Sequence, residues 1–144
     1  MKQFQTVKRQ IALAPVSGTA TAAGVVDVKD ADYATIEVVL GTAVNTNAAP
    51  VVVKIQESDT NAATAFADIN TNTLQKSIAL STAKAQVAAF HVNLNGTRKR
   101  YLRLFATPGT HTTNSVVTLA AVANLNMDQH PAGTTGQADV VAIG

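Results

Sequence analysis

The residue types that bind metals or act as nucleophiles are sparse in this chain and lie far apart. The three histidines, His91, His111 and His130, are about 20 residues apart, so no two of them have the short spacing of zinc ligands. The chain has no cysteine, which excludes a disulfide framework, a thiolate metal site and a cysteine nucleophile. It also lacks a phosphate-binding loop, a dinucleotide fingerprint and the HExxH and GxSxG motifs. We therefore expect a protein without a cofactor or metal, and not an enzyme.

Three smaller features that could carry chemistry have simpler interpretations. Asp27, Asp30 and Asp32 lack the spacing of a calcium loop, and turn formation explains them better. His91 lies between two apolar residues, so by alternation it faces away from the core as a solvated or interface side chain. The Asn95-Gly96-Thr97 sequence matches a glycosylation acceptor, but Asn-Gly is also the preferred pair of a tight hairpin turn. We interpret it as a turn only.

Positive charge is concentrated at one point of the chain. Four of its eleven basic residues fall within six positions, and we call them the basic cluster: Arg98, Lys99, Arg100 and Arg103. One interpretation is a solvated strand edge that discourages strand addition, and the other is a docking patch for an acidic protein surface. The net charge is only +2 and no long basic run occurs, so we expect no nucleic-acid partner.

The elements that would position these residues are strands. The chain contains 19 threonines and 18 valines, and β-branched side chains fit a pleated, half-buried surface better than a helix. Its 144 residues suit one domain with one core. Charged residues make up only 14% of the chain, so the exterior must be largely neutral and easily desolvated. We expect a single all-β domain, an antiparallel β-sandwich, with a surface suited to protein contacts.

Alternating apolar and polar residues predict where the strands lie. Strands are expected from Tyr33, from Pro50, and earlier at 6–14 and 24–30. Two alternating runs flank Asn95-Gly96 and predict a hairpin, whose second strand ends at a Pro108-Gly109 turn. A further strand from about residue 114 would complete a three-stranded antiparallel meander over roughly 87–126. Residues 74–89 fit either a short helix or strand structure, because alanine, glutamine and lysine favour a helix while Ser81-Thr82 interrupts it.

We assign the sandwich domain to residues 1–126, with a candidate arm at each end of the chain. Residues 1–5 are a candidate N-terminal arm, and residues 127–144 are rich in glycine and predict an extended C-terminal arm. The C-terminal segment is either a frayed end or an arm whose apolar tip docks on a neighbour. The candidate attachment residues in the two arms are Met1, Lys2, Phe4, Val140, Val141 and Ile143. No signal peptide or membrane span is recognisable, so we expect cytoplasmic production and no membrane partner.

The sequence VNLNGTRKRYLRLFATPGT, preceded by VVVKIQESDT and AFADIN, resembles the capsid cement (decoration) proteins of tailed bacteriophages. The matching segments cover about 51–69 and 90–125, roughly half of the chain, and they are structural motifs. The resemblance implies a jelly-roll-like β-sandwich, often a homotrimer, on the outer surface of the virion. Such proteins bind at junctions of the major capsid protein and stabilise the shell. The chain departs from the pattern in the alanine- and threonine-rich residues 60–89.

A second interpretation is a β-sandwich module that binds carbohydrate or a receptor, for example on a phage tail. Such modules commonly present an aromatic platform, whereas this chain has no tryptophan and its only tyrosines are Tyr33 and Tyr101. Capsid binding and glycan binding would separate the two interpretations. A hydrolase ranks third, since no catalytic motif supports it.

Overall fold

The computed structural model describes residues 7–18, 20–44, 50–69, 74–94, 98–107 and 117–126, together with the backbone of 137–142. These residues form strands joined by turns and loops, without a helix. The strands are β1 (Val7–Gly18), β2 (Ala22–Asp27), β3 (Tyr33–Leu40), β4 (Val51–Ser58), β5 (Ala67–Asp68), β6 (Gln75–Ile78), β7 (Gln86–Asn93), β8 (Tyr101–Thr107), β9 (Val117–Asn126) and β10 (Gln137–Ala142).

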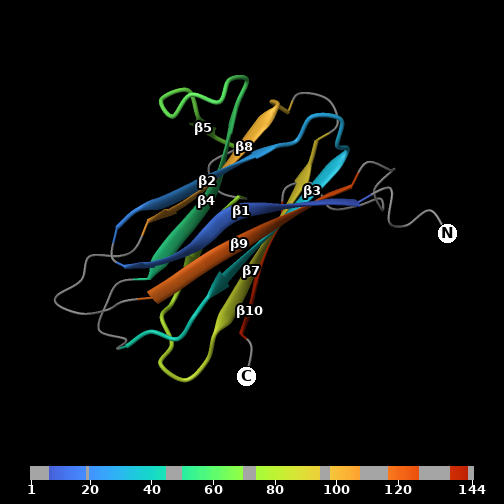
Figure 1. Cartoon of the computed structure of the whole chain (residues 1–144). Helices are drawn as coiled ribbons and strands as arrows, with labels where there is room; N and C mark the ends of the chain where they lie inside the picture. Colours follow the sequence, from blue (N-terminus) through green and yellow to red (C-terminus); the bar gives the residue numbers. More distant parts are fainter. Residues whose placement is uncertain are drawn as a thin grey trace.

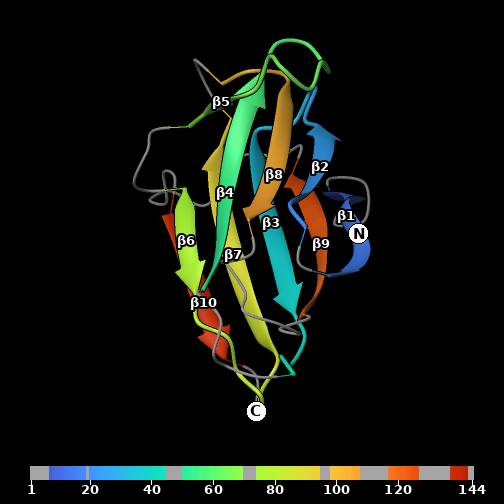
Figure 2. The same cartoon turned by 90° about the vertical axis from the view of Figure 1, so that its left-hand side faces the viewer.

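The strands form two antiparallel sheets that pack face to face (Figure 1). Sheet A has the order β1-β9-β3-β7-β10, and sheet B has the order β2-β8-β4-β5, with β6 also paired to β4. Figure 2 shows β4 and β8 of sheet B in front of β3, β7 and β9 of sheet A. The predicted all-β sandwich is confirmed. From β1 to β4, and again from β7 to β9, consecutive strands alternate between the sheets, which is compatible with a jelly-roll-like topology; that finer assignment stays a prediction.

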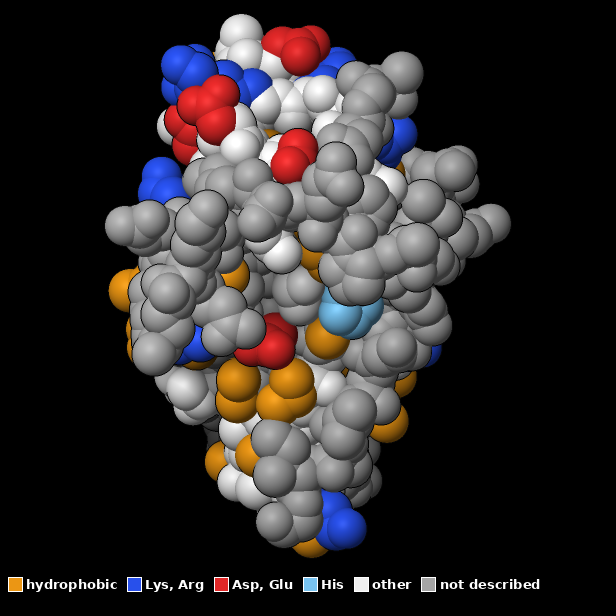
Figure 3. Space-filling view, turned by 90° about the vertical axis from the view of Figure 1, so that its right-hand side faces the viewer, with side chains coloured by type: hydrophobic (Ala, Val, Ile, Leu, Met, Phe, Trp, Pro, Cys, Tyr) orange, Lys and Arg blue, Asp and Glu red, His pale blue; other side chains and the backbone are white. Residues whose placement is uncertain are grey.

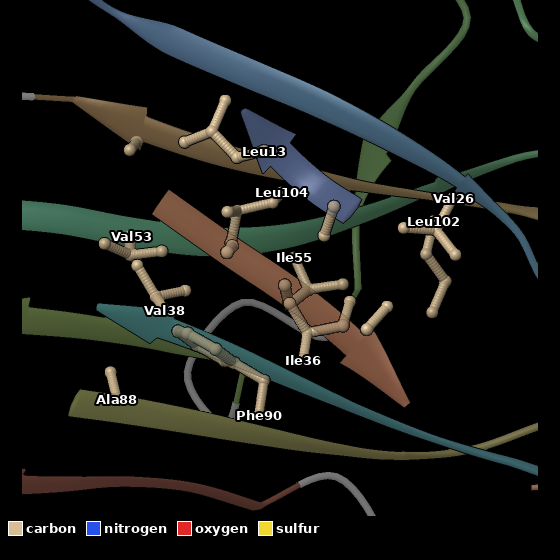
Figure 4. Close-up of a cluster of buried hydrophobic side chains, with 14 of the residues drawn as sticks. Leu13, Val26, Ile36, Val38, Val53, Ile55, Ala88, Phe90, Leu102 and Leu104 are labelled. Atoms are coloured by element: carbon tan, nitrogen blue, oxygen red, sulfur yellow. The ribbon is translucent and has the colours of Figure 1, made fainter. Parts of the chain in front are cut away.

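The core lies between the sheets and follows the alternation in the sequence. Sheet A contributes Phe90, the largest fully buried side chain, together with Ile36 and Val38, and sheet B contributes Ile55 and Leu104 (Figure 4). Because successive strand residues point to opposite faces, β3, β7, β8 and β9 each give every second side chain to this layer. Complete burial of an aliphatic or aromatic side chain of this size stabilises the fold by about 1.5–3 kcal/mol.

The predicted hairpin and meander are wrong. β7 lies in sheet A and pairs with β3 and β10, whereas β8 lies in sheet B and pairs with β2 and β4. The chain then returns to sheet A, where β9 pairs with β1 and β3. Alternation shows that a strand has one apolar face but not which strand will be its neighbour, and here each strand buries that face against the opposite sheet. The two predicted turns, at 95–96 and 108–109, lie outside the described residues.

Residues 74–89, which the sequence left open between helix and strand, are strand, turn and strand. β6 ends at Ile78 and β7 begins at Gln86. Between them the hydroxyl of Ser81 accepts hydrogen bonds from the backbone N–H groups of Ala83, at 3.2 Å, and Lys84, at 3.1 Å. A serine side chain that bonds the backbone two and three residues ahead competes with a continuing helix. The short helix therefore does not form.

The C-terminal arm predicted for 127–144 is, in part, a strand of the sandwich. β10 pairs antiparallel with β7, and its residues Val140 and Val141 lie opposite Ala88 and Val87. Without β10, β7 would be the edge strand and would leave a row of backbone N–H and C=O groups unpaired; β10 pairs with these groups. The domain thus extends beyond residue 126. Residues 1–6, 127–136 and 143–144 lie outside the described part of the chain.

At the other edge of the sandwich, β1 and β2 come from different sheets and touch. A Cβ atom placed on Gly24 would lie 1.6 Å from the carbonyl oxygen of Ala12, so only glycine allows this approach. Nearby, Gln10 Nε2 donates a 3.3 Å hydrogen bond to the carbonyl oxygen of Asp27. Register shifts in β1 between Ile11 and Leu13, and between Leu13 and Val16, bend the edge strand. The two sheets are closed against each other on this side.

Candidate interaction surfaces

The basic cluster lies where β8 begins, and its most strongly paired member is Arg100. The guanidinium of Arg100 donates two hydrogen bonds to the carboxylate of Asp27, from Nε at 3.1 Å and Nη2 at 2.8 Å. The pKa of Asp27 falls from its ordinary value of 3.8 to about 2, chiefly because Arg100 donates hydrogen bonds to the carboxylate. Desolvation of the carboxylate acts in the opposite direction but is the weaker effect. Reciprocally, the hydrogen bond from Asp27 raises the pKa of Arg100. This bidentate pair joins β2 to the start of β8.

The next two members of the basic cluster pair with acidic residues at the end of β4. Arg98 Nη1 lies 3.7 Å from Glu57 Oε2, and the backbone N–H of Lys99 donates to the same oxygen at 3.2 Å. The ammonium of Lys99 lies 3.4 Å from Asp59. Residues 98–100 precede β8 and are not in a strand, so the strand alternation expected for their side chains does not apply. Their directions are set by these ionic contacts.

Arg103, on the outer face of sheet B, holds a loop against the sheet. Its Nε donates to Gln56 Oε1 at 2.8 Å, and its Nη1 donates to the carbonyl oxygen of Ala63 at 2.8 Å. The guanidinium also lies 4.5 Å from the ring centre of Phe66 and 5.3 Å from that of Phe105. Arg103 thus fixes the segment between β4 and β5 over sheet B, and its contacts are internal to the fold.

A second set of contacts supports the same region. Gln56 Nε2 donates to Asp68 Oδ1 at 2.6 Å, and Lys54 Nζ lies 2.9 Å from the Asp68 carboxylate. The hydrogen bond from Lys54 is the main cause that lowers the pKa of Asp68. Since all four members of the basic cluster also have an acidic or polar partner within the chain, the local charge is largely compensated. A role in docking to an acidic surface stays a prediction, and the arrangement favours a structural role for the cluster.

The outer face of sheet A has the opposite character, because apolar side chains are exposed on it. Ile11 is 70% exposed, Val39 43% and Val122 41%. Val122 lies opposite Ile11 on one side and Glu37 on the other, and Glu37 lies opposite Ala89. We call the apolar members of this surface the apolar patch: Ile11, Val39, Val87, Ala89, Ala120 and Val122. Figure 3 shows hydrophobic side chains on this side of the molecule beside an acidic side chain, with a histidine and a basic side chain nearby.

The other half of this face is polar. The rings of Tyr33 and His91 stack with their centres 6.2 Å apart and an angle of 28° between their planes. The hydroxyl of Thr35 lies 3.4 Å from His91 Nδ1, and Asn124 lies opposite Thr35 on β9. The neighbours of His91 in sequence, at 90 and 92, are fully buried, so the prediction that His91 faces away from the core is confirmed. The apolar patch is thus bounded by a polar border, as is common where one protein covers another.

The acidic cluster of the β2–β3 turn has the structural role expected from the sequence. The carboxylate of Asp27 accepts a hydrogen bond from the backbone N–H of Lys29 at 3.0 Å, in addition to its pair with Arg100. Asp30 adopts a φ of 65°, a turn conformation that aspartate tolerates better than most residues. Within the described residues no three histidine, aspartate or glutamate side chains come together in a way that could hold a metal ion.

The tail residues proposed for attachment are only partly placed. Val140 and Val141 lie in β10, where only the backbone is described, and Met1, Lys2, Phe4 and Ile143 lie outside the described residues. No helix in the described part of the chain is long and apolar enough to cross a membrane. The apolar patch is not among the sites predicted from the sequence. Its signal was present in Val39 and Val122, which are apolar residues at solvent-side positions of alternating strands.

Comparison of the chain with protein-family models and with curated protein sequences finds no match.

Proposed function

We propose that the protein is a structural component that attaches to the outer surface of a tailed-phage capsid, at junctions of the major capsid protein, and stabilises the shell. The observation that carries the attachment role is the apolar patch, where valines of the central strands β3 and β9 are exposed beside few charges. Exposed apolar surface of this kind is typical of protein-binding sites. The choice of a phage capsid as the assembly comes from the resemblance of residues 51–69 and 90–125 to cement proteins.

The size of sheet A suits such a contact. Five strands, each about 4.8 Å from the next, and eight residues along β3 at about 3.4 Å each give a face of about 650 Å². This is near the lower end of the area that each partner buries in a specific protein interface, about 600–1,000 Å². A modest contact of this size becomes firm when several copies bind together.

We also propose that the protein acts as a homotrimer, which would place several identical contacts on one particle. Light scattering of the purified protein measures its mass directly. A trimeric mass in solution, or three copies per site on the particle, is expected. A monomer in both conditions would reject the trimer but leave the attachment role standing.

Co-sedimentation with capsids tests the attachment itself. Purified protein is mixed with capsids from the source phage that lack it, and the amount that sediments with the capsids is measured. We expect saturable binding and an increased resistance of the particles to heat or chelators. Absence of binding would refute the proposal, and selective glycan binding in its place would favour a carbohydrate-binding module.

A further inference from the structure

Glu37 lies among the apolar side chains of the outer face of sheet A and takes no part in the ion pairs among the described residues. It lies on β3, the central strand of sheet A, with Val122 opposite it on β9 and Ala89 opposite it on β7. Its side chain is exposed, and it has neither a hydrogen bond nor an ion pair with any described residue. Asp27, Glu57, Asp59 and Asp68, by contrast, each contact a cation of the same chain. Glu37 is therefore an available negative charge within the apolar patch.

This position restricts what can cover the patch. A carboxylate that is covered without a partner loses its hydration and gains nothing in return, which is strongly unfavourable. A second copy of this chain, packed face to face about the central strand, would bring two Glu37 side chains near each other, and like charges opposed in an interface cost several kcal/mol. A surface that is apolar and also offers a cation opposite Glu37 avoids both penalties.

We propose that the outer face of sheet A is the docking surface, and that its partner is a protein surface with an apolar area around one lysine or arginine that pairs with Glu37. This inference rests on the proposed attachment function and specifies its contact. It also reverses the charge that the sequence led us to expect on the partner surface, from acidic to basic. The basic cluster, which suggested an acidic partner, is paired within the chain. On the outer face of sheet A, the charge at the central strand is the acidic Glu37, whereas the exposed cation Arg9 lies opposite Asn124 at the β1 edge, where it can stay hydrated.

The first test changes the charge of Glu37 and measures the affinity for capsids that lack the protein. Glu37→Gln removes one side of the ion pair and is expected to weaken binding about tenfold or more, and Glu37→Lys, which adds repulsion, about hundredfold or more. Asp59→Lys is the matched control, because it makes the same change in charge at a side chain that is 74% exposed and follows β4 of the opposite sheet. It should bind within about twofold of the unaltered protein.

The second test removes the apolar character without changing the charge. Val39→Thr and Val122→Thr keep a β-branched side chain that suits a strand, so the fold should persist, but they place a hydroxyl in the contact. We expect each to weaken binding several-fold. Val44→Thr is the control, since Val44 is 70% exposed but lies in the loop after β3. Circular dichroism and the melting temperature verify that every variant is folded.

The outcomes separate this inference from the proposed function. If the unaltered protein does not bind capsids, the attachment function itself fails. If it binds, and Glu37→Lys, Val39→Thr and Val122→Thr all bind equally well, the docking surface is wrong while the attachment function stands. Tighter binding of Glu37→Lys would show an acidic partner at this position and would also overturn the inference.

Discussion

A single methyl group at Gly24 should test whether the close contact between β1 and β2 holds the sandwich closed. In Gly24→Ala the new Cβ would lie 1.6 Å from the Ala12 carbonyl oxygen and 2.7 Å from its carbonyl carbon. Both are backbone atoms, so no side-chain rotation can relieve the overlap, and one strand must move away from the other. Overpacking of this kind costs about 3 kcal/mol. In a chain of this size such a loss lowers the melting temperature by about 6–12 °C.

Gly41→Ala is the matched control. A Cβ at Gly41 would lie 3.5 Å from the Cβ of Thr118, which is an ordinary van der Waals contact. Thermal unfolding monitored by circular dichroism, with chemical unfolding as a second measurement, should show a large loss of stability for Gly24→Ala and little change for Gly41→Ala. Equal melting temperatures for Gly24→Ala and the unaltered protein would refute the close approach of β1 and β2.

Two further predictions concern the charged contacts. The Arg100 pair lowers the pKa of Asp27 from 3.8 to about 2, so its contribution to stability is complete above pH ~4 and is lost as the pH falls towards 2. The difference in unfolding free energy between the unaltered protein and Asp27→Asn should therefore shrink over that range, and a difference that stays constant down to pH 2 would contradict the pairing. Arg103→Ala removes the hydrogen bonds to Gln56 and Ala63 and the ring contacts, so thermolysin should cleave residues 59–66 faster while the melting temperature falls by only a few degrees. Arg103→Lys keeps the charge but not the planar guanidinium, so thermolysin should cleave it almost as fast as it cleaves Arg103→Ala. If Arg103→Ala resists thermolysin as well as the unaltered protein does, this role for Arg103 is wrong.

The internal pairing of the basic cluster changes how the surface is interpreted. A run of cations in a sequence suggests an acidic partner. Here, however, Asp27 and Glu57, from strands distant in the sequence, form ion pairs with Arg100 and Arg98. Salt bridges of this exposure contribute little to stability individually, yet they reduce the charge that the surface offers to a partner. The exposed apolar face of sheet A becomes the stronger candidate for contact.

The sequence alone determined the all-β class and much of the strand placement. Strands from Tyr33 and from Pro50 were predicted from alternation, because a half-buried strand must place every second side chain in the core, and the structure has them at Tyr33–Leu40 and Val51–Ser58. The same reasoning predicted that His91 points away from the core. These properties depend on local order along the chain, so they can be recognised without knowledge of the neighbours.

Only the tertiary structure decided which strands are neighbours and which side chains meet. β7 and β8 were expected to form a hairpin and instead lie in different sheets, because an alternating strand can bury its apolar face equally well under several pairings. The pairing of Arg100 with Asp27 joins residues 73 positions apart, and the place of Glu37 beside Val122 depends on β9 lying next to β3. The physical reason is that pairing partners are selected by the packing of the whole core, whereas local pattern specifies only which face of each strand is apolar.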